Sequence, residues 1–268
     1  MMVSTVPALP MPMPTPARGP HLKLALWFGL AGVIATALLF PYALALMPLK
    51  FAMLRHPWWT VMLLQAAQAG GLCLLLGWLG LLLGARYGLN APWLRAWVYH
   101  QTRDHSAEHR WLAAIVLGVL ASLLVIAISL LLPHPAAATT VRSLDWAWRG
   151  ALASFYGGIV EEVECRLFLV SLFVWLLARL NRQQARPWMF VTAIVLAALL
   201  FGAGHLPAAF AAGMAHSALP VARIILLNAL VGIVTGGLFW KCGLEHAMVA
   251  HFSADLVLHV ALPLASAL

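Results

Sequence analysis

The sequence predicts an all-α protein, a polytopic bundle of about seven transmembrane helices. Two observations lead to this prediction. The 268 residues are 63% hydrophobic and only 9% charged, whereas a soluble domain contains about 25% charged residues. The apolar residues also form blocks longer than about 18 residues, the length at which a helix can cross the hydrocarbon core of a bilayer.

Seven apolar blocks define the expected spans. Each reaches the roughly 20 residues that a membrane-crossing helix needs, and the fourth is long enough to tilt, bend or extend into water. The Pro-rich residues 1–23 precede them as a tail that we expect to be disordered, and the transmembrane domain takes residues 24–268. The expected spans are 24–47, 58–84, 111–132, 147–179, 187–206, 219–240 and 244–266.

The distribution of Lys and Arg predicts the orientation. With seven spans, the connections and span ends on the side that holds the N-terminus carry ten of the 16 basic residues, those on the other side carry five, and Arg166 lies in the middle of a span. Cytoplasmic loops are the ones enriched in Lys and Arg. We therefore expect a multi-pass protein of the cell inner membrane whose N-terminus lies in the cytoplasm.

The net charge of +8 does not indicate a nucleic-acid partner. The basic residues stand at the ends of apolar blocks, where they fix topology and contact anionic lipid, so the expected partner is the bilayer. The three cysteines, Cys73, Cys165 and Cys242, are scattered and form no CxxC. This pattern argues against a disulfide framework and against a zinc-thiolate site.

Four of the eight acidic residues fall well inside expected spans, namely Glu161, Glu162, Glu164 and Asp255, whereas Glu245 stands at the edge of the last span. A central Asp in a membrane helix costs about 2.5–3.5 kcal/mol on insertion scales. Ionisable side chains inside membrane spans are therefore candidates for function.

Helical spacing arranges these acids with nearby bases. Glu162 and Arg166 are four residues apart, so they share a helix face and can pair. Glu161 points about 100° away from Glu162 and is free to address a different neighbour. His251 and Asp255, also four residues apart, share one face of the seventh span.

The fifth span adds His205, which follows Gly202 and Gly204. These glycines allow a helix or a substrate backbone to approach closely. A Glu and a His that converge can activate water, and a second His can stabilise an oxyanion. Two His and a carboxylate could instead hold a divalent metal such as zinc.

Three motifs formed by these residues resemble those of a known family. Glu161 to Arg166 fits EExxxR, Phe201 to His205 fits FxxxH, and His251 to Asp255 fits HxxxN/D. In this order, over roughly 145–268, the motifs resemble the CAAX-protease and bacteriocin-processing family of intramembrane endopeptidases, also called the type II CAAX prenyl endopeptidase family.

The resemblance implies a role for each residue. Glu161 would be the catalytic base, and His205 would help it to activate water. His251 and Asp255 would line the oxyanion site. Glu162 and Arg166 would hold the motif helix in place. The implied substrate is a peptide or protein, with or without a prenyl group, and the implied enzyme uses either no tightly bound cofactor or a divalent metal such as zinc.

Two departures from the family pattern bear on activity. Position 255 is Asp rather than Asn, and an ionised Asp accepts hydrogen bonds but donates none. The Gly that usually follows the arginine is replaced by Leu167. Two further hypotheses stay open: a proton-coupled transporter, since Glu and His also serve proton relays, and a non-catalytic scaffold or immunity protein on the same fold.

Overall fold

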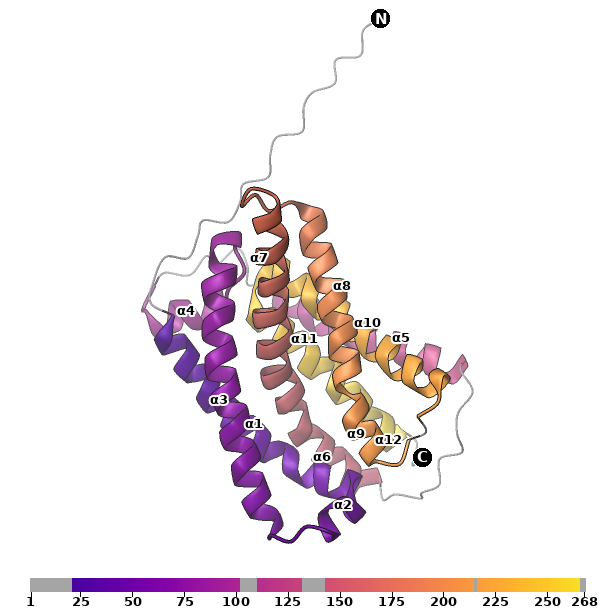
Figure 1. Ribbon diagram of the computed structural model, residues 1–268. Coiled ribbons are helices and arrows are strands. Elements are labelled where there is room, and N and C mark those ends of the chain that lie inside the picture. Colours follow the sequence, from indigo (N-terminus) through magenta and orange to yellow (C-terminus); the bar gives the residue numbers. More distant parts are fainter. Residues whose placement is uncertain (1–20, 102–109, 132–142, 215, 266–268) are drawn as a thin grey trace, which may run out of the picture.

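The computed structural model describes residues 21–101, 110–131, 143–214 and 216–265, and over these residues it contains helices and no strand. The expected Pro-rich tail lies outside the described residues up to residue 20, as does the stretch 102–109 of the polar connection after the second span. Figure 1 shows a bundle of long helices with a few short ones at its ends.

Six helical segments are long and apolar enough to cross a membrane. They confirm an integral, multi-pass membrane protein and match six of the expected spans to within a few residues. They are Leu22–Leu46 (α1), Trp58–Tyr87 (α3 Trp58–Gly84 with η1 Ala85–Tyr87), Arg110–Leu131 (α5), Pro187–Ala211 (α8 Pro187–Gly204 with α9 Leu206–Ala211), Ala218–Cys242 (α10) and Leu244–Ala265 (α11 Leu244–Leu256, η5 Val257–Ala261 and α12 Leu262–Ala265).

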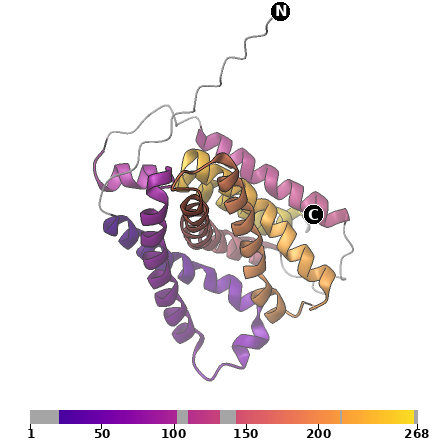
Figure 2. The same ribbon diagram turned by 45° about the horizontal axis from the view of Figure 1, so that its top comes forward.

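The remaining expected span is an unbroken helical run from residue 143 to residue 180, which Figure 2 shows at the centre of the bundle. Four charged residues lie in its middle, so its composition is less apolar than that of the others. Its central turns are wide, with the i→i+5 spacing of a π-helix, a feature often found at functional sites. The run consists of α6 Ser143–Tyr156, η3 Gly157–Glu161, η4 Val163–Val170 and α7 Ser171–Leu180.

Small residues set the distances between these helices. Gly70 of α3 lies against Gly29 and Val33 of α1, while Gly71 has open space beside it. Gly118 of α5 similarly meets the backbone of Ala250 in α11. Small side chains at such contacts let helix backbones approach closely within a membrane.

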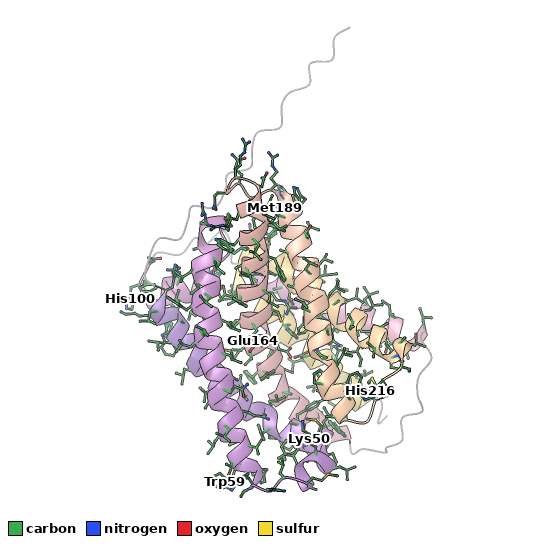
Figure 3. The ribbon with its side chains drawn as sticks, viewed as in Figure 1. Lys50, Trp59, His100, Glu164, Met189 and His216 are labelled. Atoms are coloured by element: carbon green, nitrogen blue, oxygen red, sulfur yellow. The ribbon has the colours of Figure 1, made fainter. Side chains whose placement is uncertain are left out.

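The connections expected on the cytoplasmic side contact one another at one end of the bundle. Arg86, after α3, donates to Gln183 between α7 and α8 at 3.0 Å, and the Leu244 N–H donates to the Asn90 carbonyl at 3.1 Å. Arg110 reaches the Lys241 carbonyl at 3.3 Å. Figure 3 places Met189 near this end, Trp59 at the other end and Glu164 between them.

A short helix, α4 (Pro92–Val98), is fixed at the same end. Glu245 accepts a hydrogen bond from the Leu94 N–H at 2.7 Å and so caps the first turn of α4. Arg95 of α4 donates to His21 Nδ1 at 2.7 Å. Burial and the nearby Arg95 charge lower the pKa of His21, which keeps the imidazole neutral and able to accept. Another short helix, α2 (Pro48–Ala52), lies at the opposite end.

The orientation is testable by labelling cysteines from one side of the membrane. In a variant without Cys73, Cys165 and Cys242, His56→Cys and Gln184→Cys place single thiols at exposed positions on opposite ends. We expect an impermeant maleimide to label the cysteine at position 56 in intact cells and the one at position 184 only after permeabilisation. The reverse pattern would place the N-terminus outside.

Candidate active site

The central helical run carries a buried ion pair. The Arg166 Nη1–Glu162 Oε1 distance is 3.2 Å, and the two residues are 1% and 0% exposed. The Arg166 guanidinium also lies over the Phe201 ring of α8, 4.5 Å from its centroid. The pairing expected from the spacing is therefore present, and it joins the central run to α8.

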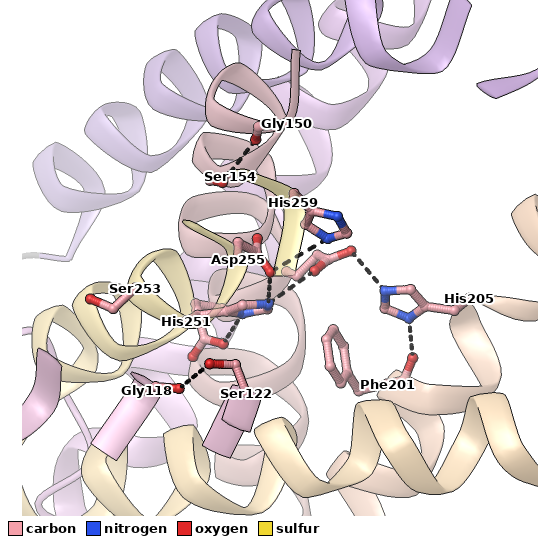
Figure 4. Close-up of polar contacts among 12 residues, drawn as sticks. Gly118, Ser122, Gly150, Ser154, Phe201, His205, His251, Ser253, Asp255 and His259 are labelled. Atoms are coloured by element: carbon pink, nitrogen blue, oxygen red, sulfur yellow. Dashed lines mark hydrogen bonds and ion pairs between the residues drawn. The ribbon is translucent and has the colours of Figure 1, made fainter. Parts of the chain in front are cut away.

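His251 of α11 lies between two of the acids. Its Nδ1 is 2.7 Å from Glu162 Oε1, and its Nε2 is 3.7 Å from Glu161 Oε2 and 3.7 Å from Asp255 Oδ1 (Figure 4). A carboxylate oxygen can only accept, so each of these contacts calls for an N–H on the imidazole. Glu162 thus contacts His251 as well as Arg166. The contact with His251 joins two helices, so helical spacing alone did not predict it.

His205 stands at the C-terminal end of α8 and approaches Glu161. Its Nδ1 is 2.9 Å from the Phe201 carbonyl, one helical turn back, and its Nε2 is 3.8 Å from Glu161 Oε1. The carbonyl only accepts, so the proton of a neutral His205 sits on Nδ1 and leaves Nε2 as an acceptor. The side chains of His205 and Glu161 are 33% and 22% exposed, whereas those of His251 and Glu162 are 4% and 0% exposed.

Two cavities meet at the Glu161–His205 pair. The larger, of about 600 Å³, is lined by Glu161, His205, His251 and Asp255, and it extends to the end of the bundle that carries α9 and the end of α1. The smaller, of about 350 Å³, lies between α3, η4 and α8, and Glu161 and His205 line it too. The structure thus brings the four predicted site residues to one cavity wall.

A glycine permits this close arrangement. A Cβ atom on Gly157 would overlap Asp255 Oδ2 and would lie 3.2 Å from His251 Nε2. Gly157 precedes the acidic motif by one helical turn, and nothing in the sequence pattern alone marks it. Its absence of a side chain lets α11 lie against the central run at the level of the site.

A metal centre, the alternative that the sequence left open, requires donor side chains that converge on one point. Among the residues that the structure describes, no group of three or more His, Cys, Asp or Glu side chains is arranged to hold a metal ion. The described donors therefore do not fit a metal ion, and no step below goes through one.

The buried Glu162–Arg166 pair leads to a prediction about the stability of the protein. Replacing one partner of a buried ion pair leaves the other charge unpaired and costs about 3–5 kcal/mol. We expect Glu162→Ala to lower the thermal unfolding temperature of the purified protein in detergent far more than Glu164→Ala, which alters a half-buried acid on the same helical run. Equal shifts for the two variants would show that the Glu162–Arg166 contact adds little.

Comparison with known proteins agrees with the motifs. Residues 143–257 match the family model described as type II CAAX prenyl endopeptidase Rce1-like. No curated protein and no solved structure matches the chain. The matched segment begins with the central helical run and ends just after Asp255, so it contains the whole Glu/His arrangement.

The match confirms the resemblance noted in the motifs and supports a CAAX-type intramembrane protease in general, with a peptide or protein substrate in the membrane. Residues 143–257 of this membrane protein therefore form an Rce1-like domain of the type II CAAX prenyl endopeptidase family.

Proposed function

We propose that the chain hydrolyses peptide bonds within the membrane, using a water molecule activated by Glu161 and His205. The observation that carries this proposal is the 3.8 Å spacing of Glu161 Oε1 and His205 Nε2 on a wall shared by two cavities. Both atoms are acceptors, and at this separation one water can donate a hydrogen bond to each of them.

The path of the proton follows from the positions of Glu161 and His205. As the water oxygen attacks the peptide carbonyl carbon, Glu161 takes one proton from the water, and His205 Nε2 orients the molecule by accepting from its other hydrogen. His205 keeps its orientation because Nδ1 is bound to the Phe201 carbonyl. When the C–N bond breaks, the proton on Glu161 passes to the leaving amine.

His251 supplies the positive charge that the reaction needs. Its Nε2 faces Glu161 and Asp255 at the cavity wall, and an N–H there can donate to the oxyanion that forms on the carbonyl oxygen. Asp255 cannot donate when ionised, so in this proposal its negative charge, 3.7 Å from His251 Nε2, stabilises the imidazolium, and the single Nε2 hydrogen serves the oxyanion. Glu162 fixes the imidazole from the opposite nitrogen at 2.7 Å.

The cavities fit a peptide that extends past the catalytic pair on both sides. The larger one has mostly apolar walls from α1, α9 and α10, with polar groups gathered at the site. It reaches the end of the bundle opposite the connections expected in the cytoplasm. With the predicted orientation, the substrate therefore enters this cavity from the non-cytoplasmic side, carrying a prenyl group or not.

Cleavage of a broad library of peptides and prenylated peptides by the purified protein in nanodiscs tests the proposal. We expect Glu161→Gln and His205→Ala each to lower kcat by about 10²–10⁴-fold, the usual contribution of a general base. Because no step uses a metal, a chelator should leave the rate of the wild type unchanged.

Two matched variants serve as controls. Asp145→Asn removes a carboxylate near the start of α6, and His56→Ala removes an exposed imidazole at the end of the bundle. Both should cleave at the wild-type rate. Loss of activity with the chelator would favour a metal-dependent enzyme. Full activity of Glu161→Gln would remove the basis of the proposed mechanism, and no cleavage by the wild type would favour a transporter or scaffold role.

A further inference from the structure

Two side chains outside the family-matched segment line the same cavity. Tyr42 belongs to α1 and His259 to η5, so one precedes residue 143 and the other follows residue 257. The Tyr42 hydroxyl lies 3.5 Å from His259 Nδ1, and the two rings meet edge to face with centroids 5.6 Å apart. The Trp146 ring also packs edge to face against the Tyr42 ring, with centroids 5.3 Å apart.

His259 in turn faces Asp255. The distance from His259 Nε2 to Asp255 Oδ1 is 3.9 Å, and the same oxygen lies 3.7 Å from His251 Nε2 (Figure 4). The other oxygen of Asp255 lies against Gly157. Asp255 is therefore enclosed by two imidazoles and a backbone, and its side chain is 14% exposed.

The hydrogen-bonding capacity of each group determines which atom donates and which accepts in this series of contacts. A phenol at neutral pH carries its proton, and its O–H can donate to His259 Nδ1. The proton of a neutral His259 then sits on Nε2, which faces the Asp255 carboxylate. The Tyr42 hydroxyl thus donates to His259, and the Nε2 atoms of His259 and His251 face the same Asp255 oxygen at 3.9 and 3.7 Å, which are ion-pair rather than hydrogen-bond distances.

We propose that Tyr42 and His259 are positioning residues that hold the Asp255 carboxylate against His251. The proposal rests on the proposed function, because it assigns their effect to the orientation of His251 at the reacting carbonyl. It makes α1 and the end of the last span parts of the site. A displacement of a catalytic group by about 1 Å can lower a rate by about 10²-fold.

The proposal also accounts for Asp at position 255. An Asn there could donate to a substrate by itself, whereas an Asp only accepts and needs N–H groups around it. His259, one turn further along the same helix, brings a second imidazole nitrogen to the same carboxylate oxygen as His251. Because the Tyr42 hydroxyl donates to Nδ1, the proton of a neutral His259 sits on Nε2.

Kinetics of three variants test this in the same peptide-cleavage assay. Tyr42→Phe removes only the hydroxyl, and His259→Leu removes the N–H donor. Each should lower kcat by about tenfold with KM unchanged, as expected for a lost charge-assisted contact. His259→Gln, whose amide can donate to Asp255, should recover most of the lost rate.

A double-mutant cycle checks that the effect passes through Asp255. In an Asp255→Asn background, we expect Tyr42→Phe and His259→Leu to cause no further loss, because coupled residues are not additive. Tyr87→Phe and His56→Leu, at positions away from the cavity, should keep the wild-type kcat. Unfolding temperatures of all variants should stay close to that of the wild type.

Each other outcome has a definite meaning. A wild-type kcat for Tyr42→Phe and His259→Leu would overturn the positioning role, as would a rise in KM alone, which would make them substrate contacts. Full additivity with Asp255→Asn would also overturn it. Loss of activity in Glu161→Gln beside unchanged Tyr42 and His259 variants would leave the proposed hydrolase intact. Activity in Glu161→Gln would instead reject the hydrolase mechanism itself.

Discussion

The contact on which the site depends is the one between His251 Nδ1 and Glu162 Oε1, 2.7 Å apart in the interior of the bundle. A charged side chain in hydrocarbon is expensive, and it is tolerated when it is paired and hydrogen-bonded. Glu162 forms an ion pair with Arg166 on its own helix and a hydrogen bond with His251 on α11. One carboxylate thus joins two helices and fixes the imidazole whose other nitrogen faces the cavity. If this contact were lost, no hydrogen bond would fix the position of Glu161 on the central run relative to His251 on α11.

Burial divides the polar residues into a supporting group and an accessible group. Glu162, Arg166 and His251 are almost fully buried, whereas Glu161 and His205 are partly exposed on the wall between two cavities. The supporting group keeps its geometry because it is closely packed, and the accessible pair, with His251 Nε2 at the same cavity wall, can meet water and a peptide. Such a division is what catalysis by a preorganised site requires, since groups held in place need no rearrangement during the reaction.

The sequence predicted the membrane bundle because apolar length is a direct physical requirement for crossing a bilayer. It also predicted the Glu162–Arg166 pair, since residues four apart on a helix are neighbours. The sequence did not predict the contacts between helices. The meeting of Tyr42 with His259 joins residues 217 positions apart, and periodicity within one span carries no information on which helix lies opposite. The same reason hid the Glu162–His251 contact and the role of Gly157.

A competing chemistry places a covalent step at Cys165, which lines the smaller cavity together with Glu161 and His205. Direct attack by water gives only the free carboxylate, whereas an acyl-enzyme on the thiol would be intercepted by an added nucleophile. The decisive measurement is therefore cleavage of a susceptible peptide in the presence of hydroxylamine, with the acyl product analysed by mass spectrometry. Water activation by Glu161 and His205 predicts the carboxylic acid alone, and a peptide hydroxamate that disappears in Cys165→Ser would contradict it.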